Sequence, residues 1–179
     1  DGGYLVCANT LKKCKNLISL GVGDDTSFER DFDKIQHTKY IFLYDYTVSI
    51  FLFIKIIFKY LRRLILFRSN YSNLIYSIKN FLKFKKFVAQ ENVNLFKEKV
   101  VSKIDNKNDV NFNKIFSRLD QKKNSLLKID IEGSEYVIID QILKFEKNIE
   151  MLVIEFHWIN KNKIRFKNSI KKLNSKFKI

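Results

Sequence analysis

The chain has 179 residues, with 34 basic and 19 acidic side chains and a formal net charge of +15. A hydrophobic fraction of 46% with 30% charged residues is typical of a globular protein and excludes simple disorder. Five glycines, no proline and two cysteines exclude collagen-like and disulfide-rich classes, and the length predicts one domain over residues 1–179.

Apolar runs that stop at turn residues predict the first strands. The run at 17–20 ends at the turn Gly21-Val22-Gly23-Asp24-Asp25, and a short helix is expected over 26–34. A second apolar run at 40–44 ends at Asp45, and a weaker third candidate lies within 93–101.

The second half of the chain repeats this alternation. A strand over 126–131 closes at Glu132-Gly133, and helical spacing follows over 134–145. Residues 151–156 predict a fifth strand and 164–173 a helix. Residues 177–179 are interpreted as the opening of a sixth strand.

Strands that alternate with helices predict βαβ units. The expected fold is therefore α/β: a Rossmann-like, doubly wound, mainly parallel sheet with helices on both faces. Ligands of such sheets bind at the carboxyl ends of the strands, near the point where strand order reverses. This rule nominates residues 21–24, Asp45, 130–133 and 155–158.

The glycines stand at strand ends, where they either end a strand or let the backbone approach a ligand. The turn Gly21-x-Gly23 after a first strand is typical of a nucleotide-like site. Asp45 lies 22 residues past Gly23. An acidic residue about 20 residues on binds ribose hydroxyls in such sites.

Two ligands fit this arrangement, a dinucleotide and S-adenosylmethionine. The third glycine of the dinucleotide fingerprint would fall at Thr26, and Asp24 and Asp25 put negative charge where a pyrophosphate would lie. A sulfonium ligand with an ammonium group meets no such repulsion. The sign of the charge therefore favours S-adenosylmethionine over NAD.

Four segments resemble those of the FkbM-type methyltransferases. They are LLKIDIEGSEY at 126–136, MLVIEFH at 151–157, DGGY at 1–4 and SLGVGDDTSF at 19–28. The resemblance covers nearly the whole chain apart from residues 46–90. It implies a class I S-adenosylmethionine-dependent methyltransferase with a seven-stranded sheet, whose last strands are missing from these residues, and most often O-methylation of sugars or natural products.

Site residues follow from the resemblance by position. Gly21, Val22 and Gly23 would line the methionine moiety, Asp45 would hold the ribose, and Asp130 would lie beside the transferred methyl group. Ser19 stands where many class I enzymes have an acidic residue. We expect Asp24 or Asp130 to serve the amino-acid end of the cofactor instead.

Methyl transfer to a hydroxyl needs a proton acceptor. The candidate catalytic residues are Asp130, Glu132 and His157, with Glu155 as a further candidate base. Two of them have structural alternatives, since His157 could bond a loop and Glu132 could cap the helix at 134. The spacing Asp130-x-Glu132 could also ligate Mg²⁺, but without a third ligand no metal is predicted.

Residues 46–90 form a basic, largely apolar insert. Nine basic and no acidic side chains lie between Asp45 and Glu91. Too many charges interrupt 48–67 for a spanning helix, so amphipathic helices over 48–87 are expected. They could cover the sheet and the acceptor pocket, bind an anionic membrane surface, or bind a protein or nucleic-acid partner.

The predicted function is a methyltransferase acting on a small-molecule or glycan hydroxyl acceptor. The alternatives are a non-catalytic membrane-surface or partner-binding protein with a degenerate fold, and an NAD-dependent enzyme. Nucleic acid is disfavoured because 28 of the 34 basic residues are lysine, whereas nucleic-acid readers favour arginine. Two unpaired cysteines suggest a reducing compartment, so we expect a cytoplasmic protein, with peripheral attachment to the inner membrane face left open.

Overall fold

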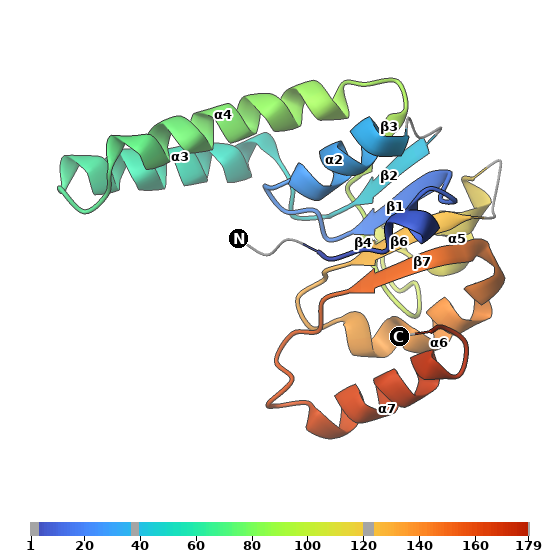
Figure 1. Cartoon of the computed structure of the whole chain (residues 1–179). Coiled ribbons are helices and arrows are strands. Elements are labelled where there is room, and N and C mark those ends of the chain that lie inside the picture. The colour runs from blue at the N-terminus through green and yellow to red at the C-terminus, as the bar shows by residue number, and fades with distance from the viewer. Residues whose placement is uncertain (1–3, 37–39, 120–123, 179) are drawn as a thin grey trace.

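Figure 1 shows the computed structural model of the chain, which describes residues 4–36, 40–119 and 124–178. Five parallel strands form one sheet in the order β3-β2-β1-β6-β7. They are β1 (Asn16–Leu20), β2 (Tyr40–Tyr44), β3 (Val93–Phe96), β6 (Ser125–Ile129) and β7 (Ile149–Ile154). Strand order reverses between β1 and β6, so this is the point where a ligand is expected.

Helices cover both faces of the sheet (Figure 1). One face carries α1 (Ala8–Leu11), α2 (Ser27–Gln36) and the end of α4 (Tyr71–Val88). The other carries α5 (Phe112–Ser117), α6 (Glu135–Lys144) and α7 (Lys163–Asn174), and a short 3-10 helix, η1 (Glu146–Asn148), precedes β7. The predicted α/β fold is thus confirmed.

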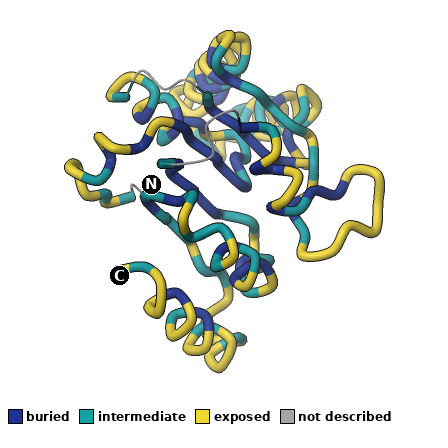
Figure 2. The backbone as a smooth tube through the Cα atoms, turned by 90° about the vertical axis from the view of Figure 1, so that its right-hand side faces the viewer, coloured by how far each residue is buried: buried dark blue, intermediate teal, exposed yellow. Residues whose placement is uncertain are grey.

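The three central strands, β2, β1 and β6, are buried on both sides, which explains their continuous apolar runs. In β1, Ile18 and Leu20 point into the core under α5 and α6, whereas Leu17 points into the core under α2. All five residues of β1 and all five of β6 are buried. Figure 2 shows these strands running between helices that are exposed on their outer sides.

Two of the expected strands differ in the structure. Only β3 of the 93–101 segment joins the main sheet, because the chain turns away after it. There β4 (Lys99–Val100) pairs with β5 (Asp109–Val110) in a separate two-stranded sheet. The prediction of a sixth strand is wrong for Phe177 and Lys178, which follow α7 without forming a strand. Phe177 packs against the core instead. Ile179 lies outside the described residues.

The basic insert is a helical hairpin, α3 (Ile50–Ile65) followed by α4. Its base packs through Val48, Phe53 and Phe84, which form their own apolar cluster. The rest of α3 and the first half of α4 project away from the sheet (Figure 1). The insert therefore does not cover the sheet as a whole; only its base does.

Glycine at position 21 is required by a close approach of two strand ends, and this generates a prediction. Gly21 has φ +78°, and a Cβ there would lie 1.7 Å from the Asp130 carbonyl oxygen. Gly23 has φ +61°, but a Cβ there would meet nothing within 4 Å. We expect Gly21→Ala to lower the free energy of unfolding by more than about 3 kcal/mol, and Gly23→Ala by about 1 kcal/mol.

Urea unfolding of the two variants measures this difference. Equal losses would show that the left-handed backbone conformation, rather than the contact with Asp130, dominates at both positions.

Candidate active site

The carboxyl ends of the central strands enclose a cavity of about 430 Å³. It lies at the switch point between β1 and β6, as the fold rule predicts. Its lining comprises Tyr4, Gly21, Val22, Gly23, Asp24, Asp25, Ser27, Phe28, Asp45, Thr47, Lys128, Asp130, Glu132 and Glu155. A larger hollow of about 600 Å³ follows the edge strand β7, but it shares none of these residues.

The glycine turn is held in place by Asp45. One carboxylate oxygen, Oδ2, accepts hydrogen bonds from the backbone N–H of Val22 at 3.1 Å and of Gly23 at 2.8 Å. The other, Oδ1, accepts from the backbone N–H and the hydroxyl of Thr47, at 2.7 and 2.6 Å. A carboxylate has about four acceptor positions, so Asp45 already uses them within the protein.

This role of Asp45 was not predicted from the sequence. Its carboxylate is buried and shapes the turn that borders the cavity. Ribose binding by Asp45 stays a prediction, and ribose hydroxyls would share oxygens that now hold the turn.

A buried ion pair borders the cavity through Lys128. Lys128 of β6 places its ammonium 3.1 Å from Glu29 Oε1 of α2, and both side chains are at most 5% exposed. The Ser19 hydroxyl donates to the same oxygen at 2.7 Å. Ser19 and Lys128 are neighbours across the β1–β6 pair, which brings both to α2. The Glu29 carboxylate therefore contacts Ser19, where many class I enzymes have an acidic residue in the strand itself. Here the acidic residue comes from helix α2 instead of strand β1.

Asp130 and Glu155 meet at the cavity wall under the Tyr4 hydroxyl. That hydroxyl donates to Glu155 Oε2 at 2.8 Å and lies 3.2 Å from Asp130 Oδ2. Burial and the bond to Glu155 raise the pKa of Tyr4, so the hydroxyl remains a donor. Burial also raises the pKa of Asp130 despite the opposing effect of Lys128. Asp130 is therefore a stronger base than an ordinary aspartate.

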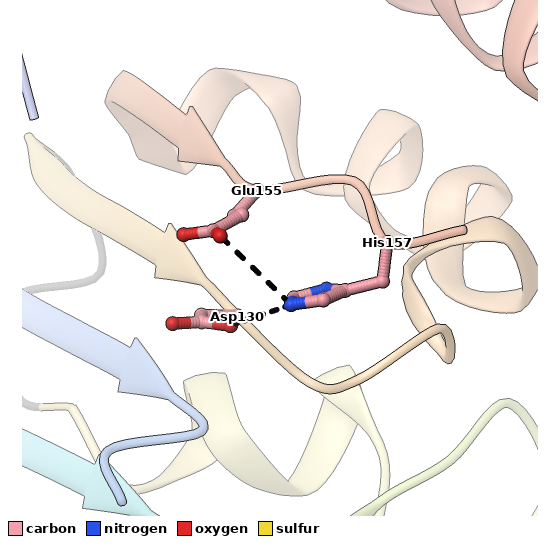
Figure 3. A group of neighbouring side chains, drawn as sticks. All are labelled: Asp130, Glu155 and His157. Atoms are coloured by element: carbon pink, nitrogen blue, oxygen red, sulfur yellow. Dashed lines mark ion pairs between the residues drawn. The ribbon is translucent and has the colours of Figure 1, made fainter. Parts of the chain in front are cut away.

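His157 lies beside these two carboxylates, and its ring extends toward both of them (Figure 3). Its Nε2 atom is 3.5 Å from Asp130 Oδ1 and 3.9 Å from Glu155 Oε1, while Nδ1 is 2.8 Å from Glu135 Oε1. A carboxylate only accepts, so Nδ1 carries a proton toward Glu135. Burial alone would lower the pKa of His157, but Glu135 and Asp130 outweigh it and raise that pKa.

Glu135 is the residue that sequence reasoning missed at this end of the site. It is fully buried at the start of α6. Its Oε1 also accepts from the backbone N–H of Ile131 at 3.2 Å and of Gly133 at 3.0 Å. Glu135 thus binds amides of the loop that precedes α6, whereas Glu132, the alternative cap considered for this helix, is exposed at φ +53°. The sequence did contain a signal for this role, since Glu135 is an acidic residue in the first turn of the predicted helix, where acidic side chains often bind free backbone amides.

Asp130, Glu155 and His157 could hold a divalent cation. One ligand atom from each lies within 4.8 Å of the others (Figure 3). The carboxylate behind Nδ1 is also the usual support of a metal-binding histidine. The sequence suggested Asp130 and Glu132 as a pair of metal ligands. In the structure Glu155, rather than Glu132, lies with Asp130 and His157.

The structure thus brings most of the predicted site residues together. Gly21, Val22, Gly23, Asp24 and Asp45 line the cavity. Asp130 and Glu132 line it too, and His157 lies beside Asp130. Of the N-terminal DGGY element, Tyr4 reaches the cavity, while residues 1–3 lie outside the described residues.

The buried ion pair generates a stability prediction. Removing one partner leaves the other charge buried and unpaired, which costs about 3–5 kcal/mol. Lys128→Met is expected to lower the free energy of unfolding by this amount. Adding Glu29→Gln in the same chain is expected to restore at least half of the loss. Equal stability of the single and double variants in urea unfolding would contradict the pairing.

Comparison with known proteins agrees with this geometry. The model of the methyltransferase FkbM domain matches residues 6–177, which include the glycine turn, Asp45, Asp130 and His157. No curated protein and no solved structure shows significant similarity to the chain. Because the matching family model spans nearly the whole chain, the protein belongs to the FkbM methyltransferase family.

Proposed function

We propose that the protein transfers a methyl group from S-adenosylmethionine to a hydroxyl oxygen of a sugar, glycan or related compound. The observation that carries the proposal is the charge of the cavity. Six carboxylates line it, from Asp24, Asp25, Asp45, Asp130, Glu132 and Glu155. A single ammonium, that of Lys128, faces them, and it is already paired with Glu29.

This charge suits the proposed cofactor. S-adenosylmethionine carries a sulfonium and an ammonium group, which an acidic cavity attracts, whereas the pyrophosphate of NAD would be repelled. The cavity volume of about 430 Å³ lies in the range of about 300–1,000 Å³ that small-molecule sites occupy. Gly21–Gly23, with Asp24 and Asp130 beside them, would hold the methionine end.

When bound, S-adenosylmethionine supplies an electrophilic methyl group, so the protein itself must orient the acceptor and take its proton. Asp130 lines the cavity and is made more basic by burial. His157 Nε2 lies beside it, and Glu135 keeps the imidazole in place. We assign the proton acceptor to this Asp130–His157 pair.

Cofactor binding tests the first part of the proposal. In calorimetric titration we expect micromolar binding of S-adenosylmethionine and S-adenosylhomocysteine and no binding of NAD. Asp45→Asn should weaken binding at least tenfold, since the amide cannot accept all the hydrogen bonds that hold the glycine turn. Lys107→Asn is the control, because Lys107 is exposed and does not line the cavity. Binding of NAD alone would overturn the proposal.

The pH dependence of transfer tests the proton acceptor. The rate should rise with pH as the Asp130–His157 pair loses its proton, with an apparent pKa that belongs to the pair. Glu135 raises the pKa of His157, so Glu135→Gln is expected to move this rise to lower pH. Asp130→Asn should slow transfer by roughly 10²–10⁴-fold when the rate is measured at saturating S-adenosylmethionine, where any weaker cofactor binding does not limit it.

Glu132→Gln, a neutralised carboxylate on the same loop, is the comparison and should cost less than about tenfold. Activity that requires a divalent cation and is lost on chelation would instead assign Asp130, Glu155 and His157 to a metal.

A further inference from the structure

Residues 50–82 of the α3–α4 hairpin, which we call the hairpin arm, expose an unusual amount of apolar surface. Twelve large apolar side chains are exposed there: Ile50, Phe51, Ile54, Phe58, Leu61, Ile65, Leu66, Phe67, Tyr71, Tyr76, Ile78 and Leu82. Contiguous exposed apolar surface of this kind marks a binding surface in soluble proteins. The rest of the described chain leaves its apolar side chains exposed only at scattered positions.

The side chains of α3 divide into three faces when placed at about 100° per residue. The first face contains Phe53, whose ring packs on Phe81 and Phe84 of α4. The second is an exposed apolar stripe about 100° wide. It consists of Ile50, Phe51, Ile54, Phe58, Leu61 and Ile65. Packing between the two helices therefore does not account for this second stripe.

The third face of α3 is basic. Lys55, Lys59, Arg62 and Arg63 occupy about 100° of arc directly beside the exposed apolar stripe. In α4, lysines flank the exposed Ile78 and Leu82 in the same way. Those lysines are Lys79, Lys83, Lys85 and Lys86.

The charges of the insert are not compensated within the protein. Residues 46–90 contain nine basic and no acidic side chains. Among the described residues, none of these nine cations forms an ion pair, although basic residues elsewhere in the chain do. The surface therefore combines uncompensated positive charge with an apolar stripe.

The tip of the hairpin presents an aromatic side chain to solvent. Phe67 is 98% exposed and its backbone has φ +53°, a conformation that costs free energy for a residue with a bulky side chain. Its neighbours Leu66 and Arg68 are also exposed. The tip thus repeats the pattern of both helices, an apolar group beside a cation.

We propose that the hairpin arm binds the protein to the surface of an anionic lipid bilayer. The apolar stripe would enter the boundary between headgroups and acyl chains, and the flanking cations would contact lipid phosphates. No helix among the described residues is long and apolar enough to cross a membrane, so the arm would lie in the interface.

Charge and polarity favour this occupant over two others. A second copy of the arm would bring six further cations and no carboxylate against the first. A nucleic acid would match the charge but would leave the apolar stripe, with Phe58 and Phe67, in water. An anionic bilayer matches both the cations and the stripe.

The arm leaves the sheet at the edge that carries the cavity. α3 begins five residues after Asp45, and the side-chain amide of Asn80 donates to the Asp24 carbonyl oxygen at 2.7 Å. A bilayer bound to the arm would therefore lie on the side of the sheet where the cavity is found. The inference concerns only where the protein binds and does not rest on the proposed methyl transfer.

Sedimentation of the full chain with vesicles tests the proposal. We expect partition onto phosphatidylcholine vesicles that contain phosphatidylglycerol, and little onto phosphatidylcholine alone. Each cation near such a surface contributes about 1 kcal/mol, or about fivefold in the partition coefficient. Lys59→Gln with Arg62→Gln should thus weaken partition about 25-fold. The matched control, Lys107→Gln with Lys161→Gln, removes the same charge elsewhere and should change it less than about threefold.

A second pair of variants tests the apolar contribution. Phe58→Ser with Phe67→Asn should weaken partition at least about tenfold, because both rings leave the lipid and asparagine tolerates the left-handed backbone at position 67. Ile164→Ser, at an exposed site in α7, is the control. Circular dichroism establishes that every variant is folded.

Equal partition onto the two kinds of vesicle would overturn the proposal, as would unchanged partition of the arm variants. So would a lipid-free dimer in analytical ultracentrifugation that Phe58→Ser disperses, because it would show that a second copy covers the stripe.

Discussion

The contact on which the site depends is the approach of the Asp130 carbonyl to Gly21. The carbonyl occupies the space in which a side chain at position 21 would begin. Because glycine has no side chain to compete for this space, the ends of β1 and β6 lie side by side where strand order reverses. The glycine turn and the Asp130 carboxylate then border the same cavity, although about 110 residues separate them in the chain.

Two buried carboxylates support this cavity from behind. Glu29 joins α2 to β6 through Lys128, which lines the cavity. Glu135 holds the loop amides that follow β6 and the imidazole of His157 at the wall. Each of these carboxylates is buried and bonded through its Oε1 atom to several groups, which restricts how those groups can be arranged. The acidic residues of the cavity are therefore positioned by polar contacts as well as by the apolar core.

The hairpin arm differs from the rest of the domain in leaving many large apolar side chains exposed. The sheet and its covering helices bury their apolar side chains on both faces, whereas the arm leaves a stripe of them in solvent. The stripe is flanked by cations that form no ion pair within the described part of the chain. Packing within the domain does not account for such a surface. Its composition is explained by an external partner that is both anionic and apolar, and a bilayer surface has both properties.

The sequence alone determined the parts of the structure that depend on neighbouring residues. Continuous apolar runs predicted the strands at 17–20, 40–44 and 126–131, because burial on both faces of a parallel sheet leaves no polar alternation. Turn residues placed the glycine turn and Asp130 at strand ends. The short pairing of β4 with β5 was missed, since strands of two residues leave no periodic signal.

Only the tertiary structure decided which polar groups meet. Glu29 pairs with Lys128, about 100 residues away in the chain, and Glu135 contacts His157. Tyr4, near the start of the sequence, donates a hydrogen bond to Glu155, near its end. In the sequence, Lys128 interrupts an apolar strand and Glu29 lies in a polar helix. Neither pattern indicates which residue the side chain contacts. Periodicity records which face of an element is buried, whereas the partner on that face is set by the packing of elements that are distant in the chain.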